Sequence, residues 1–339
     1  MNSMSTGRAS AIVLLIKSYA PDLEYTRRLM DSIESFNVEH LPVFLVVPES
    51  DLGIFSEFAH RDVNILSEEL FASHLVRELT AGFSAGYINQ EIVKLSFWEL
   101  GLCENYFCVD SDAEFIRPFS HRDFLHHDQV PYTFLTEDRE LVAEPDYYQS
   151  TWVNRMKSLE KIRGAIGYTG PWLFTVHGHA VFSAKVLESF VTDFLEPRGW
   201  DYKDALAISP YEPTWYNTWL LHTSVIEIFP REPLVKTFHN SQQHLEYQLR
   251  GIRKEDAARG FLAVVVNSNY SRGHGVMDTD NSLKDTLAAY VPLPQLLRAF
   301  GFKFRRDVFI RRTPLRKLRV WLGALALKIP GVRRLVQSG

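Results

Sequence analysis

Continuous apolar runs alternate with segments of helical periodicity over the first third of the chain. Residues 11–19 (AIVLLIKSY) and 41–51 (LPVFLVVPESD) contain apolar runs of strand length, and residues 63–71 provide a shorter third run. Between the first two, residues 20–36 carry apolar side chains near helical spacing and include Pro21 at a plausible helix start. Strands that are apolar throughout and separated by helices are typical of a parallel sheet covered by helices. The sequence therefore predicts an α/β fold.

A second helix is predicted over residues 84–100 (SAGYINQEIVKLSFWEL), with Gln90 and Lys94 on the face opposite the apolar residues. The apolar run that follows ends in Asp110, Ser111 and Asp112, within YFCVDSDAEFI. The acidic pair therefore emerges at the carboxyl end of a predicted strand. Ligands bind at that edge in open α/β sheets.

The rest of the chain is less regular. Helices are predicted over residues 147–167, in the latter part of 175–196 and in the latter half of 209–223. We expect one large α/β domain over residues 1–300 and a separate basic tail over residues 301–339. The chain of 339 residues is 46% hydrophobic, which is enough for a core of that size.

Charge is distributed unevenly between these two parts. The formal net charge of −4 gives no sign of a nucleic-acid-binding protein. From Lys303 onward, however, eleven Lys and Arg residues face a single acid, Asp307, which makes the tail about +10 and the remainder about −14. Interleaved with Leu, Val, Ile and Trp321, these cations predict an amphipathic helix, broken at Pro330, that lies on an anionic membrane. A solvated extension and a helix docked on a partner subunit are the alternatives.

Other features favour a cytoplasmic protein. The two cysteines, Cys103 and Cys108, have no metal-binding residues near them in sequence and are expected to be reduced. The first apolar run is too short for a signal peptide or a membrane span. The predicted location is therefore the cytoplasm, with the tail at the inner face of the cell membrane.

Two carboxylates placed two residues apart are costly unless a positive group lies beside them. Mg²⁺ and Mn²⁺ are often held by one or two carboxylates together with substrate phosphates. Such a cation would also neutralise the charge that grows on a departing diphosphate. The alternative is a solvated loop in which Asp110 caps the next turn.

The segments CVDSDAEFIRPF, GYINQEIVKL, LLIKSYAPDLEYTRRLMDSI and VFLVVPESDL together resemble the GT-A glycosyltransferases. More narrowly, they resemble a group of uncharacterised bacterial GT-A-like proteins (DUF6492-like) linked to polysaccharide synthesis. The resemblance covers roughly residues 10–270. It implies a mostly parallel, Rossmann-like sheet, with a nucleotide-sugar half over residues 10–120 and an acceptor half over residues 121–300. It also implies a Mn²⁺ or Mg²⁺ cofactor and transfer of a sugar to a glycan or lipid-linked acceptor.

The same resemblance assigns roles to individual positions. Asp112 matches the carboxylate that usually contacts the metal, and Asp110 the one nearer the ribose and metal-bound water. The positions implied to contact the nucleotide sugar are Lys17, Ser18, Tyr19, Asp51, Gln90, Lys94, Asp110 and Ser111. A solvated lysine is the alternative for Lys94, and turn chemistry is the alternative for Tyr19 and Asp51.

Later segments offer a base and a third metal ligand. Glu212 lies where such enzymes place an acid near the acceptor, and it could deprotonate the acceptor hydroxyl. Its aromatic neighbours Tyr211, Trp215 and Trp219 could stack on sugars or belong to the core. His239 matches a late-loop metal ligand but could equally be structural.

His177 and His179, in VHGHAVFS, fall where the resemblance implies the acceptor pocket. A zinc site built on these two histidines would need further ligands that the sequence does not reveal. The predicted activity is therefore glycosyl transfer, with inversion if Glu212 is a base and retention if it is not. A non-catalytic sugar- or membrane-binding scaffold is the main alternative. A nucleotidyltransferase is less favoured because KSYAPD lacks a Gly-rich loop.

Overall fold

The computed structural model describes most of the chain up to residue 266. The described ranges are residues 10–80, 82–127, 130–135, 145–172, 179–238 and 253–266. The chain divides into two compact units, residues 1–236 with 261–265, and residues 237–260 with 266–339. The first unit contains the described site residues discussed below. His239 and the predicted basic tail lie outside the described residues, and the proposed boundary at residue 300 stays a prediction.

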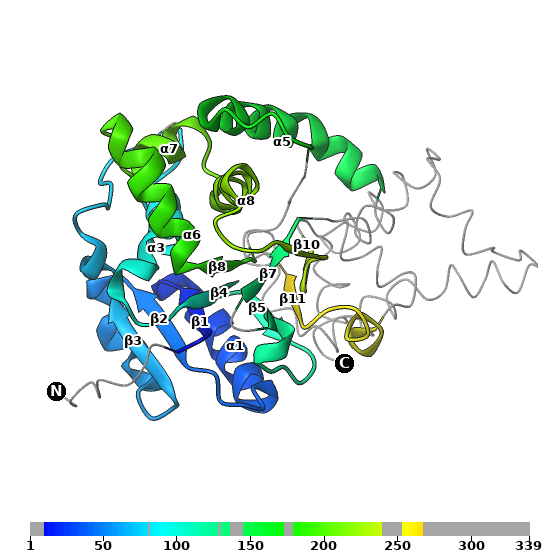
Figure 1. The fold of residues 1–339 in the computed structure, drawn as a ribbon. Helices are drawn as coiled ribbons and strands as arrows, with labels where there is room; N and C mark the ends of the chain where they lie inside the picture. Colours follow the sequence, from blue (N-terminus) through cyan, green and yellow to red (C-terminus); the bar gives the residue numbers. More distant parts are fainter. Residues whose placement is uncertain are drawn as a thin grey trace, which may run out of the picture. The chain divides into compact units, whose positions relative to one another are not determined.

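A five-stranded sheet of order β3-β2-β1-β4-β8 forms the centre of the first unit (Figure 1). The strands β3, β2, β1 and β4 run parallel to one another, whereas β8 pairs antiparallel with β4. The bounds are β1 Val13–Lys17, β2 Val43–Val47, β3 Val63–Ser67, β4 Asn105–Asp110 and β8 Val181–Ser183. The predicted α/β fold with a mostly parallel sheet is therefore confirmed.

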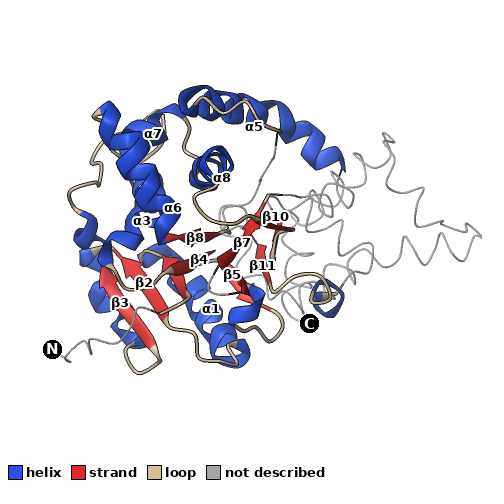
Figure 2. Cartoon of the chain, in the orientation of Figure 1, coloured by secondary structure: helices blue, strands red, loops and turns tan. Residues whose placement is uncertain are grey.

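Helices cover both faces of this sheet (Figure 2), with α1 on one side and α3, α6 and α8 on the other. A sheet enclosed in this way explains why its strands are apolar throughout. The α-helices of four or more residues are α1 Leu23–Phe36, α2 Leu52–Phe55, α3 Ala85–Ser96, α5 Pro145–Ile166, α6 Ala184–Ser189, α7 Tyr202–Ile208, α8 Glu212–Thr223 and, in the second unit, α10 Lys254–Ala257. A π-helix, Phe190–Leu195, follows α6 directly.

Short strands form two smaller sheets, of order β10-β11-β5 and β6-β7-β9. Their bounds are β5 Ala113–Phe115, β6 Leu125–His127, β7 Val130–Phe134, β9 Phe229–Arg231, β10 Val235–Phe238 and β11 Ala263–Val266. Since β5 begins three residues after β4 ends, the chain turns sharply at Ser111 and Asp112. Cys103 and Cys108 are both free and buried.

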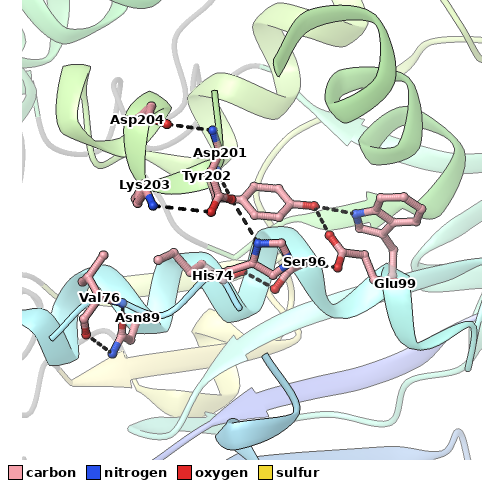
Figure 3. Close-up of polar contacts among 11 residues, drawn as sticks. His74, Val76, Asn89, Ser96, Glu99, Asp201, Tyr202, Lys203 and Asp204 are labelled. Carbon is pink, nitrogen blue, oxygen red and sulfur yellow. Dashed lines mark hydrogen bonds and ion pairs between the residues drawn. The ribbon is translucent and has the colours of Figure 1, made fainter. Parts of the chain in front are cut away.

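A polar cluster tethers the segment before α3 to α7 (Figure 3). His74 lies between two carboxylates, with Nδ1 3.0 Å from Asp201 Oδ1 and Nε2 3.0 Å from Glu99 Oε2. Tyr202 donates a hydrogen bond to the same Glu99 over 2.6 Å. Three segments that are distant in sequence therefore meet at one imidazole.

This cluster predicts a pH-dependent stability. The hydrogen bonds that His74 donates to Asp201 and Glu99 raise the pKa of His74 from 6.5 to about 9. The stabilisation is complete below about pH 6.5 and is lost as the pH rises through 9. Because the site is partly solvated, we expect the free energy of unfolding to fall by about 2 kcal/mol, which is less than the pKa shift would give in full.

Urea denaturation at about pH 6.5 and 9.5 checks this prediction. The free energy of unfolding of the wild type should fall between these pH values by about 2 kcal/mol more than that of His74→Gln. The exposed His60 supplies the control, and His60→Gln should follow the wild type. Equal pH dependence in His74→Gln and the wild type would contradict the prediction.

Candidate functional site

The carboxyl ends of β1, β2 and β4 meet at one edge of the sheet. Lys17 and Asp110 are directly paired across β1 and β4. In the loop after β2, Asp51 accepts a hydrogen bond from the backbone N–H of Ala20 over 2.7 Å. The structure therefore brings the predicted nucleotide-binding segments after β1, β2 and β4 to the same edge, as the strand order requires.

The individual side chains at this edge differ in accessibility. Lys17 forms an ion pair with Glu68 over 2.8 Å, and its side chain is almost buried. Ser18 is buried and shares a 2.8 Å hydrogen bond with Thr26. Tyr19 is the exposed member of the three, so it is the one best placed to meet a ligand.

A buried lysine occupies the centre of the site. The Lys94 Nζ lies 3.1 Å from Glu212 Oε1, 3.3 Å from Asp110 Oδ1 and 3.3 Å from Glu91 Oε2. Only 6% of the Lys94 side chain is exposed, so the alternative of a solvated lysine is wrong. The reason is tertiary, because α8 packs against α3 and places Glu212 over the polar face of α3.

The charges in this group nearly balance. Burial, together with the charge of Glu212, raises the pKa of Glu91 well above its ordinary value, which favours the neutral form of this side chain. Burial alone would lower the pKa of Lys94, but the attraction of Asp110, Glu212 and Glu91 outweighs it and raises that pKa. One buried ammonium therefore lies within 3.3 Å of three acidic side chains, so the cluster holds more acidic groups than cations.

His179 borders Asp110 on the other side. Its Nε2 lies 3.3 Å from Asp110 Oδ2, and only 3% of the histidine is exposed. Burial lowers the pKa of His179, so the ring is neutral. Among the described residues, neither ring nitrogen has a hydrogen-bond partner of good geometry. A buried neutral imidazole with unsatisfied nitrogens is suited to bind a ligand or a metal.

The acidic motif is bent rather than extended. Strand β4 ends at Asp110, and Ser111 and Asp112 form the turn before β5. The two carboxylates are therefore not on one face of a continuous strand. Ser111 is buried, with Oγ 3.4 Å from Asp22 Oδ2, while Asp110 keeps 30% of its side chain exposed. Asp110 is the most exposed member of the Lys94 cluster.

The aromatic residues of α8 belong to the core. Trp215 is fully buried and donates to the carbonyl of Ser209 over 2.8 Å, and Trp219 is 5% exposed. The stacking alternative is therefore wrong for both tryptophans, because the face that carries them packs inward. Tyr211, directly before α8, and Gln90, on α3, are half-buried. His177 and His239 lie outside the described residues.

The described residues fit a divalent cation only in part. No group of three or more His, Cys, Asp or Glu side chains among them is placed to hold a metal. Mg²⁺, however, is usually held by one or two carboxylates together with phosphate oxygens and water. Asp110 and Asp112, with the neutral His179 beside them, fit a cation that completes its coordination with phosphates. None of the described helices has the length and apolarity to span a membrane.

The first half of the chain matches a known family model. Residues 8–168, just under half of the chain, match the model of a family of unknown function, DUF6492. This match covers β1 to β4 and both aspartates of the acidic turn. No curated protein matches the chain.

Two solved structures are similar to this chain, and both are glycosyltransferases. Mouse xyloside xylosyltransferase 1, in its apo form, aligns with a TM-score of 0.46 and 8% identity over 76% of this chain and 98% of its own. The bifunctional glycosyltransferase WbbM, also apo, aligns with a TM-score of 0.43 and 13% identity over 77% of this chain and 46% of its own. At these scores the likeness does not extend to function, which has to be inferred from the residues of the site.

Proposed function

We propose that this protein is a metal-dependent glycosyltransferase of the GT-A type. It would transfer a sugar from a nucleoside-diphosphate donor to a glycan or lipid-linked acceptor in bacterial surface polysaccharide synthesis. The observation that supports this most is the position of Asp110. Its partly exposed carboxylate ends a central parallel strand, between a buried lysine and a neutral histidine.

Asp110 and Asp112 would hold the Mn²⁺ or Mg²⁺. When bound, such a cation neutralises the charge that develops on the departing diphosphate. Lys94 fixes the orientation of Asp110 through the 3.3 Å contact and limits the repulsion between Asp110 and Glu212. Tyr19 and Asp51 lie at the strand ends where the nucleotide base is expected.

Glu212 is the proposed base for the acceptor hydroxyl. Its carboxylate belongs to the same cluster as Asp110 but is only 3% exposed, and it already accepts from Lys94 over 3.1 Å. If Glu212 removes the proton, the anomeric configuration is inverted. If Glu212 serves only to pair Lys94, retention with the leaving phosphate as base is the simpler course.

Thermal shift against nucleoside diphosphates and nucleotide sugars tests this proposal. Each compound is added with Mn²⁺ or with EDTA, to the wild type and to Asp112→Asn. We expect one nucleotide to stabilise the wild type selectively, with about 2.7 kcal/mol at one hundred times its dissociation constant. The stabilisation should disappear with EDTA and in Asp112→Asn.

A non-catalytic scaffold is the second candidate. It is favoured by one observation, namely that both Asp110 oxygens already lie within 3.3 Å of a protein nitrogen. A scaffold would bind nucleotides without metal dependence, or would not bind nucleotides at all. The proposed peripheral association with the inner face of the membrane depends on residues 301–339 and is independent of either outcome.

A further inference from the structure

An exposed aromatic pair stands at the start of α3. The rings of Phe83 and Tyr87 stack with their centroids 5.1 Å apart and their planes 25° from parallel. Phe83 is 37% exposed and Tyr87 is 36% exposed. Two stacked rings that both keep this much surface in water present a flat apolar platform.

The platform is held in place by the backbone around it. Thr80 and Phe83 exchange backbone hydrogen bonds of 3.0 and 2.9 Å, around a turn in which Gly82 adopts a φ of +85°. Ser84 caps α3 by accepting from the N–H of Tyr87 over 3.3 Å. The platform is therefore pre-organised, which lowers the entropic cost of binding a ligand.

The platform adjoins the Lys94 cluster. Tyr87, Glu91 and Lys94 are spaced by four and three residues, so they lie on one face of α3. Partial burial raises the pKa of Tyr87, and the nearby acidic side chains of Glu91 and Glu212 raise it further. The phenol of Tyr87 therefore lies within electrostatic range of both acidic side chains, including that of the proposed base, Glu212.

The surrounding charge indicates the kind of ligand. The charged cluster beside the platform contains Asp110 and Glu212 against the single cation Lys94, which disfavours a phosphate on the platform unless a bound cation accompanies it. Carboxylates accept hydrogen bonds from sugar hydroxyls, and the C–H face of a pyranose can pack on an aromatic ring. The nucleotide base is expected elsewhere, at the ends of β1 and β2.

We propose that Phe83 and Tyr87 form the stacking platform for the acceptor sugar, a neutral pyranose whose reacting hydroxyl points towards Glu212. This inference rests on the proposed function and adds to it the class of acceptor and the residues that select it. It replaces Trp215 and Trp219, whose burial removes them from such a role.

Saturation-transfer difference NMR with a panel of methyl glycosides tests the platform, in the presence of Mg²⁺ and the stabilising nucleoside diphosphate. At least one glycoside should bind the wild type and show the strongest transfer to the protons of one ring face. Phe83→Leu and Tyr87→Leu keep apolar bulk but lose the aromatic face, and each should weaken binding about fivefold, since aromatic pairing is worth roughly 1 kcal/mol. Tyr87→Phe should bind like the wild type.

Trp172→Leu is the matched control. Trp172 follows α5 in sequence, is 49% exposed, and packs its ring against the Arg163 guanidinium rather than against Phe83 or Tyr87. It should leave glycoside binding unchanged. Unchanged binding in both Phe83→Leu and Tyr87→Leu would overturn the proposal. The absence of glycoside binding would also overturn it. One such case is that Phe83 and Tyr87 join two copies of the chain, and the Leu variants would then lower the molecular mass measured in solution.

Nucleotide binding, measured on the same variants by thermal shift, separates this proposal from the preceding one. Phe83→Leu and Tyr87→Leu should keep the metal-dependent stabilisation by the nucleotide. Glycoside binding that depends on the platform, without any nucleotide effect, would support the platform while contradicting the proposed donor site.

Discussion

Replacing Lys94 by Met is expected to lower the free energy of unfolding by about 3–5 kcal/mol. The side chain is 6% exposed, and its removal leaves Asp110 and Glu212 as like charges with no cation between them. The methionine fills the volume of the lysine stem, so the loss reports the missing charge rather than a cavity. Urea denaturation of the two proteins at neutral pH measures the difference.

The neighbours of Lys94 give this prediction its controls. Glu91→Gln should change the stability by less than about 1 kcal/mol, because burial favours the neutral form of Glu91, which resembles an amide in shape and charge. Glu212→Gln in the Lys94→Met background should recover part of the loss by removing one unpaired charge. Lys185 is exposed, and Lys185→Met should be nearly neutral. A cost in Glu91→Gln as large as that in Lys94→Met would contradict the proposed charge balance.

The sequence predicts the sheet well because the signal is local. The apolar runs become β1, β2 and β4, and the helix expected over residues 84–100 becomes α3 followed by a short 3-10 helix. The place of the acidic motif at the end of a strand also follows from the pattern. The sharp turn at Ser111 and Asp112 into β5 does not follow from the pattern, since it depends on the pairing of β5 with β11, which is distant in sequence.

The environment of the site residues is harder to predict because it is tertiary. Lys94 makes its shortest contact with Glu212, 118 residues later, so a solvated lysine and a buried, paired lysine look alike in sequence. The same ambiguity hides His179, which meets Asp110 across the antiparallel β4–β8 pair. The partner of each residue is decided by tertiary packing, of α8 against α3 for Lys94 and of β8 against β4 for His179.

Aromatic composition misleads in the same way. Trp215 and Trp219 share a helix with the candidate base, yet both face the core. Phe83 and Tyr87 give a weaker signal, although their spacing of four residues around Ser84, a helix-capping residue, predicts neighbouring rings at a helix start. Whether an aromatic side chain on a helix is exposed or belongs to the core therefore depends on which face of the helix packs against the sheet.

Asp110→Asn is expected to reduce glycosyl transfer at least about 1000-fold, because it removes a carboxylate that the proposed metal–diphosphate site requires. The rate is measured as release of nucleoside diphosphate from the nucleotide sugar that stabilises the wild type. The fold should persist, with a loss of the free energy of unfolding below about 2 kcal/mol, because Lys94 keeps its 3.1 Å contact with Glu212 and the amide keeps the shape of the side chain.

The two possible roles of Asp110 predict different patterns. A metal-binding Asp110 loses both transfer and the Mn²⁺-dependent nucleotide stabilisation in Asp110→Asn, while Asp193→Asn, an exposed acid after α6, retains both. An Asp110 that serves only as an ion-pair partner of Lys94 gives a variant with lower stability but metal dependence like that of the wild type. Transfer within tenfold of the wild type would therefore assign Asp110 to the stability of the buried lysine and contradict the proposed metal site.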